Sequence, residues 1–356
     1  MKLLLAGACG FVGSVLAETL LDRCEGLSIL GLDSLLRPGS ETNRVALRQR
    51  GVTLVHGDIR SASDLECLPA VDWVIDAAAN PSVLAGMRQG FSSRQLFEHN
   101  LAGTVNLLEY AKQHRAGFIL LSSSRVYSIP ALCAIPLQTR NAAYVLDAGA
   151  PLPAGVTRDG IGRGFSTAAP VSLYGAAKLA CETMALEYGD AFGFPVWVNR
   201  CGVLAGAGQF GTPDQGIFSY WIHAHRARRP LRYLGFDGSG KQVRDAFHPR
   251  DLAGLIDAQM RSAAPVSGSR TYAVGGGPSN AMSLANLTAW CDDRFGAHAP
   301  APDPTPRLYD VPWVVMDSGD ALRDFGWTVE TPIERTLDEI AVHAANHPDW
   351  LERSGL

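Results

Sequence analysis

The sequence predicts an α/β protein, with a doubly wound parallel sheet followed by a smaller C-terminal lobe of mixed α/β structure. Three observations predict this class. Short apolar runs alternate with segments of helical periodicity, a glycine-rich turn follows the first run, and the alternation weakens after about residue 200. Each of these features also indicates where a site should lie.

Seven apolar runs rich in Val, Ile and Leu have the length and composition of buried strands. They are 2–8, 27–33, 52–58, 72–79, 118–124, 195–201 and 271–277. Helical periodicity separates the early runs, as in 11–24 and 92–114. Strands this apolar, alternating with helices, indicate a parallel sheet covered on both faces. Right-handed crossovers then place ligand sites at the carboxyl ends of the strands.

The domain organisation follows from where this rhythm changes. Residues 1–204 are expected to form the sheet domain, with later strands near 243–277 interleaved, and residues 205–356 the second lobe. Residues 128–171 form a long, weakly periodic segment with several Pro and Gly. Loops of that length in a compact domain are usually lids or binding segments.

The composition is that of a globular protein with no bias toward nucleic acid or membrane. The 356 residues are 47% hydrophobic and 19% charged, with a formal net charge of −4. A mildly acidic chain without a dense basic block gives no reason to expect a nucleic-acid partner. No apolar run reaches the roughly 20 residues that span a bilayer, and the N-terminal run is interpreted as a strand, so we expect a cytoplasmic protein with no membrane partner.

The cysteines and histidines favour neither disulfides nor metal. Seven scattered cysteines, an odd number without a C-x-x-C pair, are expected to be buried thiols in a reducing compartment. His223 and His225 are the one close histidine pair, within "HAHRARRP" (223–230), and no Cys or carboxylate cluster stands near them in the sequence. No metal site is therefore expected.

A glycine motif directly after the first strand predicts a dinucleotide site. Gly7, Gly10 and Gly13 form a G-x-x-G-x-x-G that opens a helix, whose free N–H groups suit a pyrophosphate. Asp33 follows 20 residues after the last glycine, at the end of the second strand. A carboxylate there accepts hydrogen bonds from the adenosine ribose, which predicts a Rossmann domain that binds NAD. Arg37 nearby leaves NADP open as an alternative.

Further cofactor contacts are expected where later strands end. Asp58 and Ile59 end the third strand, where an acid suits the adenine amino group and an apolar side chain suits the ring. Ala77, Ala78 and Ala79 end the fourth strand, where small side chains let a cofactor lie against the backbone. Tight packing of a helix on the strand is the alternative for the alanines.

Several motifs in order support a resemblance that covers nearly the whole chain. Besides the glycine motif, these are "HGDIR" (56–60), "NLAGTVNLLE" (100–109), "SSSRVY" (122–127), Tyr174-x-x-x-Lys178, "GSGKQVRDAFHPRDL" (238–252) and "VGGG" (274–277). With them, the chain resembles the extended short-chain dehydrogenase/reductase family of nucleotide-sugar epimerases and dehydratases. Within it, "QFGTPDQG" (209–216) and "GKQVRD" (240–245) are most similar to the CDP-paratose/CDP-tyvelose 2-epimerases.

The resemblance gives a role to Tyr174 and Lys178, which lie four residues apart and share a helix face. It implies that Ser123, Tyr174 and Lys178 are catalytic. Tyr174 would take the proton of a sugar hydroxyl, and the Lys178 ammonium would favour the phenolate. Further cofactor contacts are then implied at Phe11, Val12, Asn100 and Ser122, together with Tyr174 and Lys178.

The residues after Ser123 separate two reactions of the family. Dehydratases carry Asp-Glu there, whereas this chain has Ser124-Arg125, so the resemblance implies epimerisation. In that reaction NAD oxidises the sugar transiently, and C2 of a CDP-hexose is the expected centre. Substrate contacts are expected at Ser124, Arg125, Gln215, Tyr233, Arg244 and Arg307, with Arg244 and Arg307 on the diphosphate. For Arg125, bracing of the 128–171 segment stays open.

Three residues depart from the usual pattern of the family. Asp76 stands where the family usually has His, Ser128 replaces a glycine, and Val203 replaces an asparagine. Two other functions also remain open: a 4-epimerase acting on a UDP- or TDP-sugar, and a non-catalytic NAD-binding sensor or scaffold. A homodimer is expected through helices 100–114 and 175–192, as family members usually pair.

Overall fold

The computed structural model describes residues 1–356 apart from 85, 88–91 and 263–267. Its larger part is a seven-stranded sheet in the order β14-β10-β5-β4-β1-β2-β3, with every neighbouring pair parallel. The strands are β1 (Lys2–Ala6), β2 (Ser28–Asp33), β3 (Thr53–His56), β4 (Trp73–Asp76), β5 (Gly117–Ser123), β10 (Val196–Cys201) and β14 (Thr271–Val274). The strand order reverses between β1 and β4, where a doubly wound sheet opens its ligand crevice. The predicted fold class is confirmed.

All seven expected strands are present, and most end earlier than the apolar runs do. β1 ends at Ala6 because Gly7 takes a left-handed φ of 77° and turns the chain out of the sheet. β4 likewise ends at Asp76, before the three alanines. The predicted site residues therefore lie in turns at the carboxyl edge.

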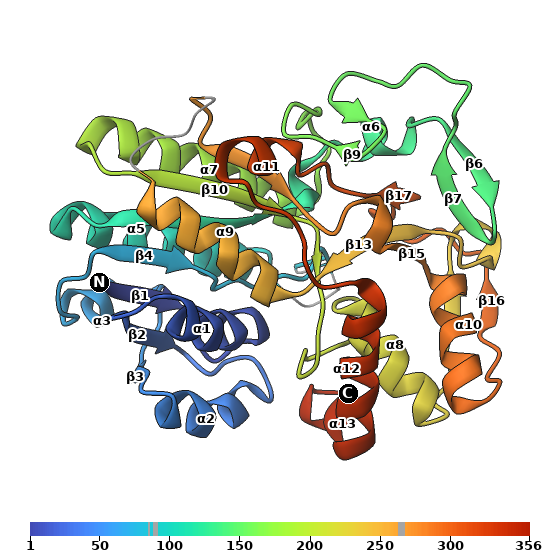
Figure 1. Ribbon diagram of the computed structural model, residues 1–356, viewed down its shortest axis with the longest axis horizontal. Coiled ribbons are helices and arrows are strands. Elements are labelled where there is room, and N and C mark those ends of the chain that lie inside the picture. Colours follow the sequence, from blue (N-terminus) through green and yellow to red (C-terminus); the bar gives the residue numbers. More distant parts are fainter. Residues whose placement is uncertain (85, 88–91, 263–267) are drawn as a thin grey trace.

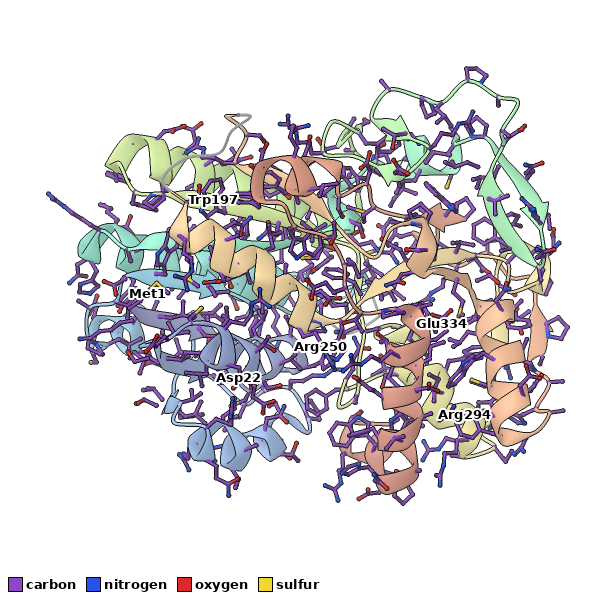
Figure 2. All side chains as sticks on the ribbon, viewed as in Figure 1. Met1, Asp22, Trp197, Arg250, Arg294 and Glu334 are labelled. Carbon is purple, nitrogen blue, oxygen red and sulfur yellow. The ribbon has the colours of Figure 1, made fainter. Side chains whose placement is uncertain are left out.

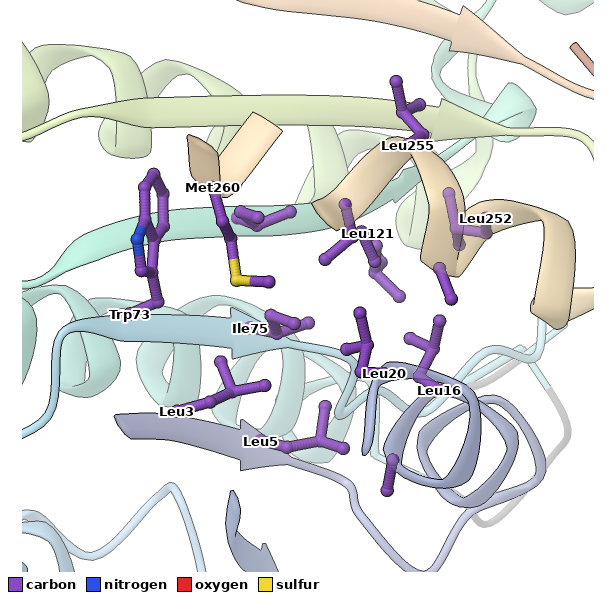
Figure 3. Close-up of a cluster of buried hydrophobic side chains, with 14 of the residues drawn as sticks. Leu3, Leu5, Leu16, Leu20, Trp73, Ile75, Leu121, Leu252, Leu255 and Met260 are labelled. Atoms are coloured by element: carbon purple, nitrogen blue, oxygen red, sulfur yellow. The ribbon is translucent and has the colours of Figure 1, made fainter. Parts of the chain in front are cut away.

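Helices cover both faces of the sheet (Figure 1). One face is packed by α1 (Phe11–Arg23), α9 (Pro249–Arg261) and α11 (Gly319–Phe325), and the other by α3 (Ala62–Glu66), α5 (Gly103–His114) and α7 (Ser172–Phe192). Figure 3 shows the first of these layers, where Leu3 and Leu5 of β1 point toward Leu16 and Leu20 of α1. Burial on both faces explains why the strands read as continuous apolar runs.

The helix expected over 92–114 is divided in the structure. It consists of α4 (Arg94–Phe97), a π-helical turn η2 (Glu98–Ala102) and then α5. Single π turns inside helices often accompany functional sites. Here the turn carries Asn100, which is 1% exposed and bonds to the loop after β4.

The second lobe is built on a smaller sheet. Its strands are β11 (Val203–Leu204), β13 (Val243–Phe247), β15 (Ala281–Ser283) and β17 (Trp313–Val314), and a separate pair joins β12 (Arg232–Leu234) to β16 (Ala301–Asp303). The helices are α8 (Ile217–Arg226), α10 (Leu284–Phe295), α12 (Ile333–Asn346) and α13 (Trp350–Arg353). Of the segment near 243–277, β14 lies in the large sheet, β13 in the small one, and residues 263–267 outside the described part.

The long segment 128–171 has its own short elements. They are α6 (Ile129–Cys133), the hairpin of β6 (Leu137–Arg140) with β7 (Ala143–Leu146), and the hairpin of β8 (Val156–Thr157) with β9 (Gly160–Ile161). Figure 1 shows the β6–β7 hairpin at the outer edge of the molecule, beside the second lobe. Tyr144 N bonds to Lys241 O at 3.0 Å, which ties this hairpin to the start of β13.

An ion pair joins the two parts at the start of α9. Arg250, at the start of α9, lies between them near the middle of the molecule (Figure 2) and forms an ion pair with Glu339 of α12. Its Nε also lies 3.0 Å from His248 Nδ1. Across the described ranges, no helix is both long and apolar enough to cross a membrane.

Candidate active site

The glycine turn between β1 and α1 is closed too tightly for a larger residue at Gly7 or Gly13. Gly7 N donates to Leu32 O at 2.8 Å, and Gly10 N donates to Gly7 O at 3.1 Å. A Cβ on Gly13 would lie 2.1 Å from Gly7 O, closer than real contacts allow. The N-terminus of α1 therefore opens directly onto the crevice, as a pyrophosphate site requires. Phe11 is 8% exposed at the first position of this helix.

Asp33 holds the loops around this turn. Its Oδ2 accepts from Cys9 N at 2.8 Å, and its Oδ1 accepts from Leu35 N at 2.8 Å. Each oxygen keeps a further lone pair, so the carboxylate still has acceptor capacity for a ribose. The donors, the helix N-terminus and the bare glycine surface together fit a dinucleotide.

Asp58 and Ile59 lie after β3 in different settings. Asp58 forms an ion pair with Arg60, and that hydrogen-bonded guanidinium lowers the pKa of the carboxyl group. Ile59 is 8% exposed and packs so closely on Gly103 that a Cβ there would meet its side chain at 2.5 Å. Asp58 is thus already partnered, and Ile59 presents an apolar wall.

The three alanines after β4 lie beside the glycine turn. A Cβ on Gly7 would lie 2.9 Å from Ala77 O and from Ala78 N. Asn80 N donates to Asn100 Oδ1 at 2.7 Å, and Asn100 Nδ2 donates to Asn80 O at 3.0 Å. Both the oxygen and the nitrogen of the Asn100 side-chain amide are therefore bonded to the loop that follows the alanines.

Tyr174 and Lys178 lie near the start of α7, on the wall of a cavity of about 530 Å³. Lys178 is 2% exposed, and its Nζ donates to Leu121 O at 3.0 Å. Tyr174 is 6% exposed and packs against Val83 and Leu96. The helix spacing expected from the sequence thus brings both side chains to one cavity.

The serine run that ends β5 faces the same cavity. Ser122 Oγ donates to Glu182 of α7, whereas Ser123 Oγ accepts from Arg125 N at 3.2 Å. The hydroxyl hydrogen of Ser123 remains free for another acceptor, because accepting this bond does not use it. Ser124 begins the short helix η3 (Ser124–Val126) and also lines the cavity.

Three arginines approach the cavity from separate segments. Arg125 donates to Tyr309 O at 3.2 Å, Arg244 lies 3.3 Å from Asp310 Oδ1, and Arg307 lies 2.9 Å from Asp214 Oδ1. Burial, reinforced by the charge of Arg244, lowers the pKa of Arg125 to about 10. Burial also lowers the pKa of Arg244. This part of the cavity is electropositive and suits an anionic group.

The structure therefore brings most of the predicted site residues together. The cavity lining includes Val12, Ala77, Ala79, Ser122, Ser123, Ser124, Arg125, Tyr174, Lys178, Gln215, Arg244 and Arg307. Tyr233 is not among the described lining residues. Its ring stacks on Trp221 at 5.6 Å, and its hydroxyl donates to Thr288 Oγ1 at 2.7 Å. Of the remaining cofactor residues, those in or beside the glycine turn are Gly7, Gly10, Phe11, Gly13, Asp33 and Ala78. Asp58 and Ile59 follow β3, and Asn100 lies in η2.

Asp214, Gln242 and Asp310 are among the polar lining residues that the sequence reasoning missed. Gln242 Nε2 donates to Leu234 O at 2.7 Å, and its buried Oε1 has no hydrogen-bond partner in the described structure. Their signal was weak, because a polar residue in a Gly- or Pro-rich loop is most often solvated. Gln242 stood inside the motif "GKQVRD", next to the singled-out Arg244.

Comparisons with known proteins identify the family of the chain. The NAD dependent epimerase/dehydratase family matches residues 3–275. CDP-paratose 2-epimerase of Salmonella typhi is 29% identical over 300 residues, which cover 82% of this chain and 84% of that protein. UDP-glucose 4-epimerase of Streptococcus mutans is 24% identical over 350 residues, covering 92% and 91%.

Solved structures share the fold. The crystal structure of UDP-glucuronic acid 4-epimerase from Bacillus cereus, in complex with UDP-glucuronic acid and NAD, superposes with a TM-score of 0.74 at 20% identity. The alignment covers 97% of this chain and 99% of that one. At this identity, the likeness concerns the fold.

Proposed function

Because the chain belongs to the NAD dependent epimerase/dehydratase family, we propose that it is a nucleotide-sugar epimerase that inverts C2 of a CDP-linked hexose. The observation that carries the proposal is the shared cavity of Ser123, Tyr174 and Lys178, next to a glycine turn that admits no larger side chain at Gly7 or Gly13. The 29% identity to a CDP-paratose 2-epimerase supports the choice of base and carbon.

The cofactor is NAD. We propose that Gly7, Gly10 and Gly13 admit its pyrophosphate and that Asp33 accepts hydrogen bonds from its adenosine ribose. Phe11, Val12, Ile59, Ala77, Ala78 and Ala79 would supply apolar or backbone contact, and Asp58, Asn100 and Ser122 would hold the loops around it. Bound NAD supplies a reversible oxidation of one sugar carbon, so epimerisation needs no net redox partner.

The proton chemistry falls to three side chains of this chain. We assign Tyr174 as the group that removes the proton of the sugar hydroxyl and, once the carbon has been inverted, returns it to the same oxygen. Lys178, one helical turn away, favours the ionised phenol by its charge. Ser123, whose hydroxyl hydrogen is uncommitted, would donate to the reacting oxygen. Because Tyr174 and Lys178 are both buried, bulk water is kept from competing for the proton.

Epimerisation is favoured over dehydration by the two residues after Ser123. Elimination of water needs an acid and a base at this place, and Ser124 and Arg125 supply neither a carboxylate nor a group that titrates near neutral pH. The guanidinium of Arg125 instead adds positive charge beside Tyr174. The keto sugar formed in the cavity would therefore rotate to present its other face and be reduced again on that face.

The substrate diphosphate is proposed to lie among the three arginines. Arg244 and Arg307 each have one carboxylate partner, whereas Arg125 donates to a neutral carbonyl, Tyr309 O. An anion there would offset the charge that lowers the pKa of Arg125. Gln215 lines the same end of the cavity and suits the nucleotide. Tyr233 would act on the nucleotide side indirectly, through Trp221, on which it stacks.

A second candidate is inversion at C4 of a UDP- or TDP-sugar. It is favoured by the 24% identity to a UDP-glucose 4-epimerase over 92% of this chain. Both reactions use the same three side chains, so the sugar and the carbon that faces Tyr174 distinguish them.

The test uses CDP-, UDP- and TDP-hexoses deuterated at C2 or at C4, with products followed by proton NMR. We expect inversion of C2 of a CDP-hexose with the deuterium kept, because the same hydrogen returns to the carbon. Inversion at C4 alone would establish the second candidate. No inversion on any sugar would overturn both.

The matched variants are Tyr174→Phe and Tyr144→Phe. We expect the first to lose at least about 100-fold in turnover, the lower range for removing a general acid–base. Tyr144 lies on the β6–β7 hairpin, outside the described cavity lining, and its variant should keep the rate. Full activity of Tyr174→Phe would contradict the assignment.

We further propose a division near residue 204, with residues 1–204 and β14 holding NAD and residues 205–356 the nucleotide sugar.

We propose a cytoplasmic homodimer paired through α5 and α7. The two helices are joined by a bond of 2.6 Å from Tyr188 to Glu109, and they present Phe192, which is 47% exposed. Light scattering that shows a monomer at micromolar concentration would contradict the dimer, and cell fractionation tests the compartment.

A further inference from the structure

A buried carboxylate ends β4 directly behind the proposed catalytic helix. Asp76 is 0% exposed. Its Oδ2 accepts from Thr104 Oγ1 at 2.6 Å, and its Oδ1 accepts from Ala78 N at 3.3 Å. A carboxylate held away from water needs compensation beyond two neutral donors, because burial of a lone charge is costly.

The backbone brings Asp76 and Lys178 to one place. Asp76 pairs with Leu120 in the β4–β5 register, and the carbonyl of the next residue, Leu121, accepts from Lys178 Nζ at 3.0 Å. Cys181 follows Lys178 by three residues on α7, and its Sγ lies 3.1 Å from Asn100 O. Thr104 Oγ1 lies 2.7 Å from that same carbonyl. One small cluster thus joins β4, β5, α5 and α7.

We propose that Asp76 is the buried counter-ion of Lys178, a positioning residue that keeps the ammonium charged beside Tyr174. Only one part of this rests on the proposed function, namely that the Lys178 charge serves catalysis by Tyr174. The proximity of the two charged groups follows from the cluster. Without a negative partner, an ammonium that is 2% exposed would tend to release its proton and lose its effect on the phenol.

The charges around the pair agree with this assignment. Burial acts to lower the pKa of Lys178, yet the pKa is raised, and the carboxylate of Asp76 is the largest of the charges that raise it. The other titratable groups acting on Lys178 are Tyr174, Cys181 and Cys201. Burial raises the pKa of Asp76, opposed by Lys178 and by the bonds from Thr104 and Ala78. We take the ionised pair as the state at neutral pH, because the Lys178 charge is the largest of the influences that favour the ionised carboxylate.

The composition of the chain allows a direct measurement. It contains four lysines, Lys2, Lys112, Lys178 and Lys241. Lysine labelled with carbon-13 next to the amine gives four NMR signals, and Lys178→Met identifies one of them. We expect the Lys178 signal to titrate about one to three pH units lower in Asp76→Asn than in the unmodified chain. An unchanged midpoint would overturn the proposal.

Asp251→Asn is the matched control. Asp251 is 7% exposed and, like Asp76, accepts from a threonine hydroxyl, that of Thr331 at 2.9 Å. It lies at the start of α9, outside the cluster, so its variant should leave the Lys178 midpoint in place. A shift of equal size in both variants would mean that general loosening, and no specific counter-ion, moves the lysine, and this too would overturn the proposal.

A second measurement covers the case in which Asp76→Asn fails to fold. Each of the single variants Asp76→Asn and Lys178→Met leaves one buried charge alone, whereas the double variant leaves none. We expect the double variant to melt at a higher temperature than either single variant. If the fall in melting temperature of the double variant equals the sum of the falls in the two single variants, the pair is contradicted. Neither measurement needs substrate, turnover or NAD, so a chain inactive on every nucleotide sugar can still have the counter-ion, and an active one can lack it.

Discussion

The guanidinium of Arg37 lies 3.2 Å from Gln215 Oε1 and joins the loop after β2 to the loop before α8. The same guanidinium donates to Phe210 O, and Phe210 stacks on Trp350 at 5.2 Å. Phe11 of the glycine turn belongs to the same hydrophobic cluster. Arg37 was the reason for keeping NADP as an alternative cofactor. In the structure it is engaged by the second lobe, whose Phe210 and Trp350 pack with Phe11 of the glycine turn.

We expect Arg37→Ala to release NAD more readily. Loss of two hydrogen bonds from a half-buried cation should cost about 1.5–3 kcal/mol at the contact between lobes. The NAD content of the protein after extended dialysis, and its melting temperature, would both fall. Arg50→Ala is the control, because Arg50 pairs with Asp22 on the exposed side of the same domain. Equal NAD content in both variants would contradict the prediction.

Gly13→Ala should damage the dinucleotide turn. The added Cβ would meet Gly7 O at 2.1 Å, and backbone cannot move aside as a flexible side chain can. We expect a loss of stability of about 1–3 kcal/mol, as for other overpacked sites, and little bound NAD after purification. Gly164→Ala, where a Cβ meets nothing within 4 Å, should behave as the unmodified chain. Normal NAD content in Gly13→Ala would rule out the close approach.

Glu182→Gln should destabilise the core behind the serine run. Glu182 and Arg200 lie 2.7 Å apart with side chains 4% and 11% exposed, and Ser122 also donates to Glu182. Removal of the charge leaves a buried guanidinium unpaired, which costs about 3–5 kcal/mol. Urea denaturation measures it. Asp338→Asn, which breaks an exposed pair with Arg294, should change stability by less than about 1 kcal/mol. Equal effects would show that burial does not distinguish the pairs.

Two histidines should make the second lobe sensitive to acid. His223 of α8 lies 3.3 Å from His343 of α12, and burial lowers the pKa of His223 to about 3 and that of His343 to about 4. The unfolded chain binds these protons near pH 6.5. Each histidine therefore contributes stability that is complete above pH 6.5 and is lost toward pH 4, by about 1.4 kcal/mol per pH unit.

The comparison that isolates this effect is His343→Gln against the unmodified chain. Between about pH 6 and 4 we expect the variant to lose stability less steeply in urea denaturation. The slopes of variant and unmodified chain must be compared, because Asp245 has the opposite effect on the unmodified slope. Burial raises its pKa to about 7, so its protonation stabilises the fold as the pH falls. His56→Gln changes an exposed histidine and should keep the original slope. Parallel slopes for all three proteins would refute the role of the pair.

The parts of the site that the sequence predicted are those set within a few residues. Gly7 and Gly13 are separated by less than two helical turns, and Tyr174 and Lys178 by about one. A left-handed turn or a shared helix face follows from such spacing without knowledge of the rest of the fold. The strands were predictable for a similar reason, because burial on both faces makes each run continuously apolar. The predictions of NAD and of the family are confirmed.

The contacts that were missed join distant segments. Arg125 meets the carbonyl of Tyr309 across 184 positions of sequence, and Arg37 meets Gln215 across 178. His223 stands in a basic stretch typical of the end of a surface helix. In the structure α12 packs over it, and only 4% of it is exposed. No local pattern records which loop crosses which, so none of these partners was identifiable beforehand.

The sequence by itself determined the sheet, the bare glycine turn and the helix face that carries Tyr174 and Lys178, because periodicity and backbone sterics act over short range. Only the tertiary structure decided that Asp76 lies behind Lys178 and that Arg37 ties the two lobes together. Such relationships depend on strand register and on the path of loops around the core. These emerge only when the whole chain has packed.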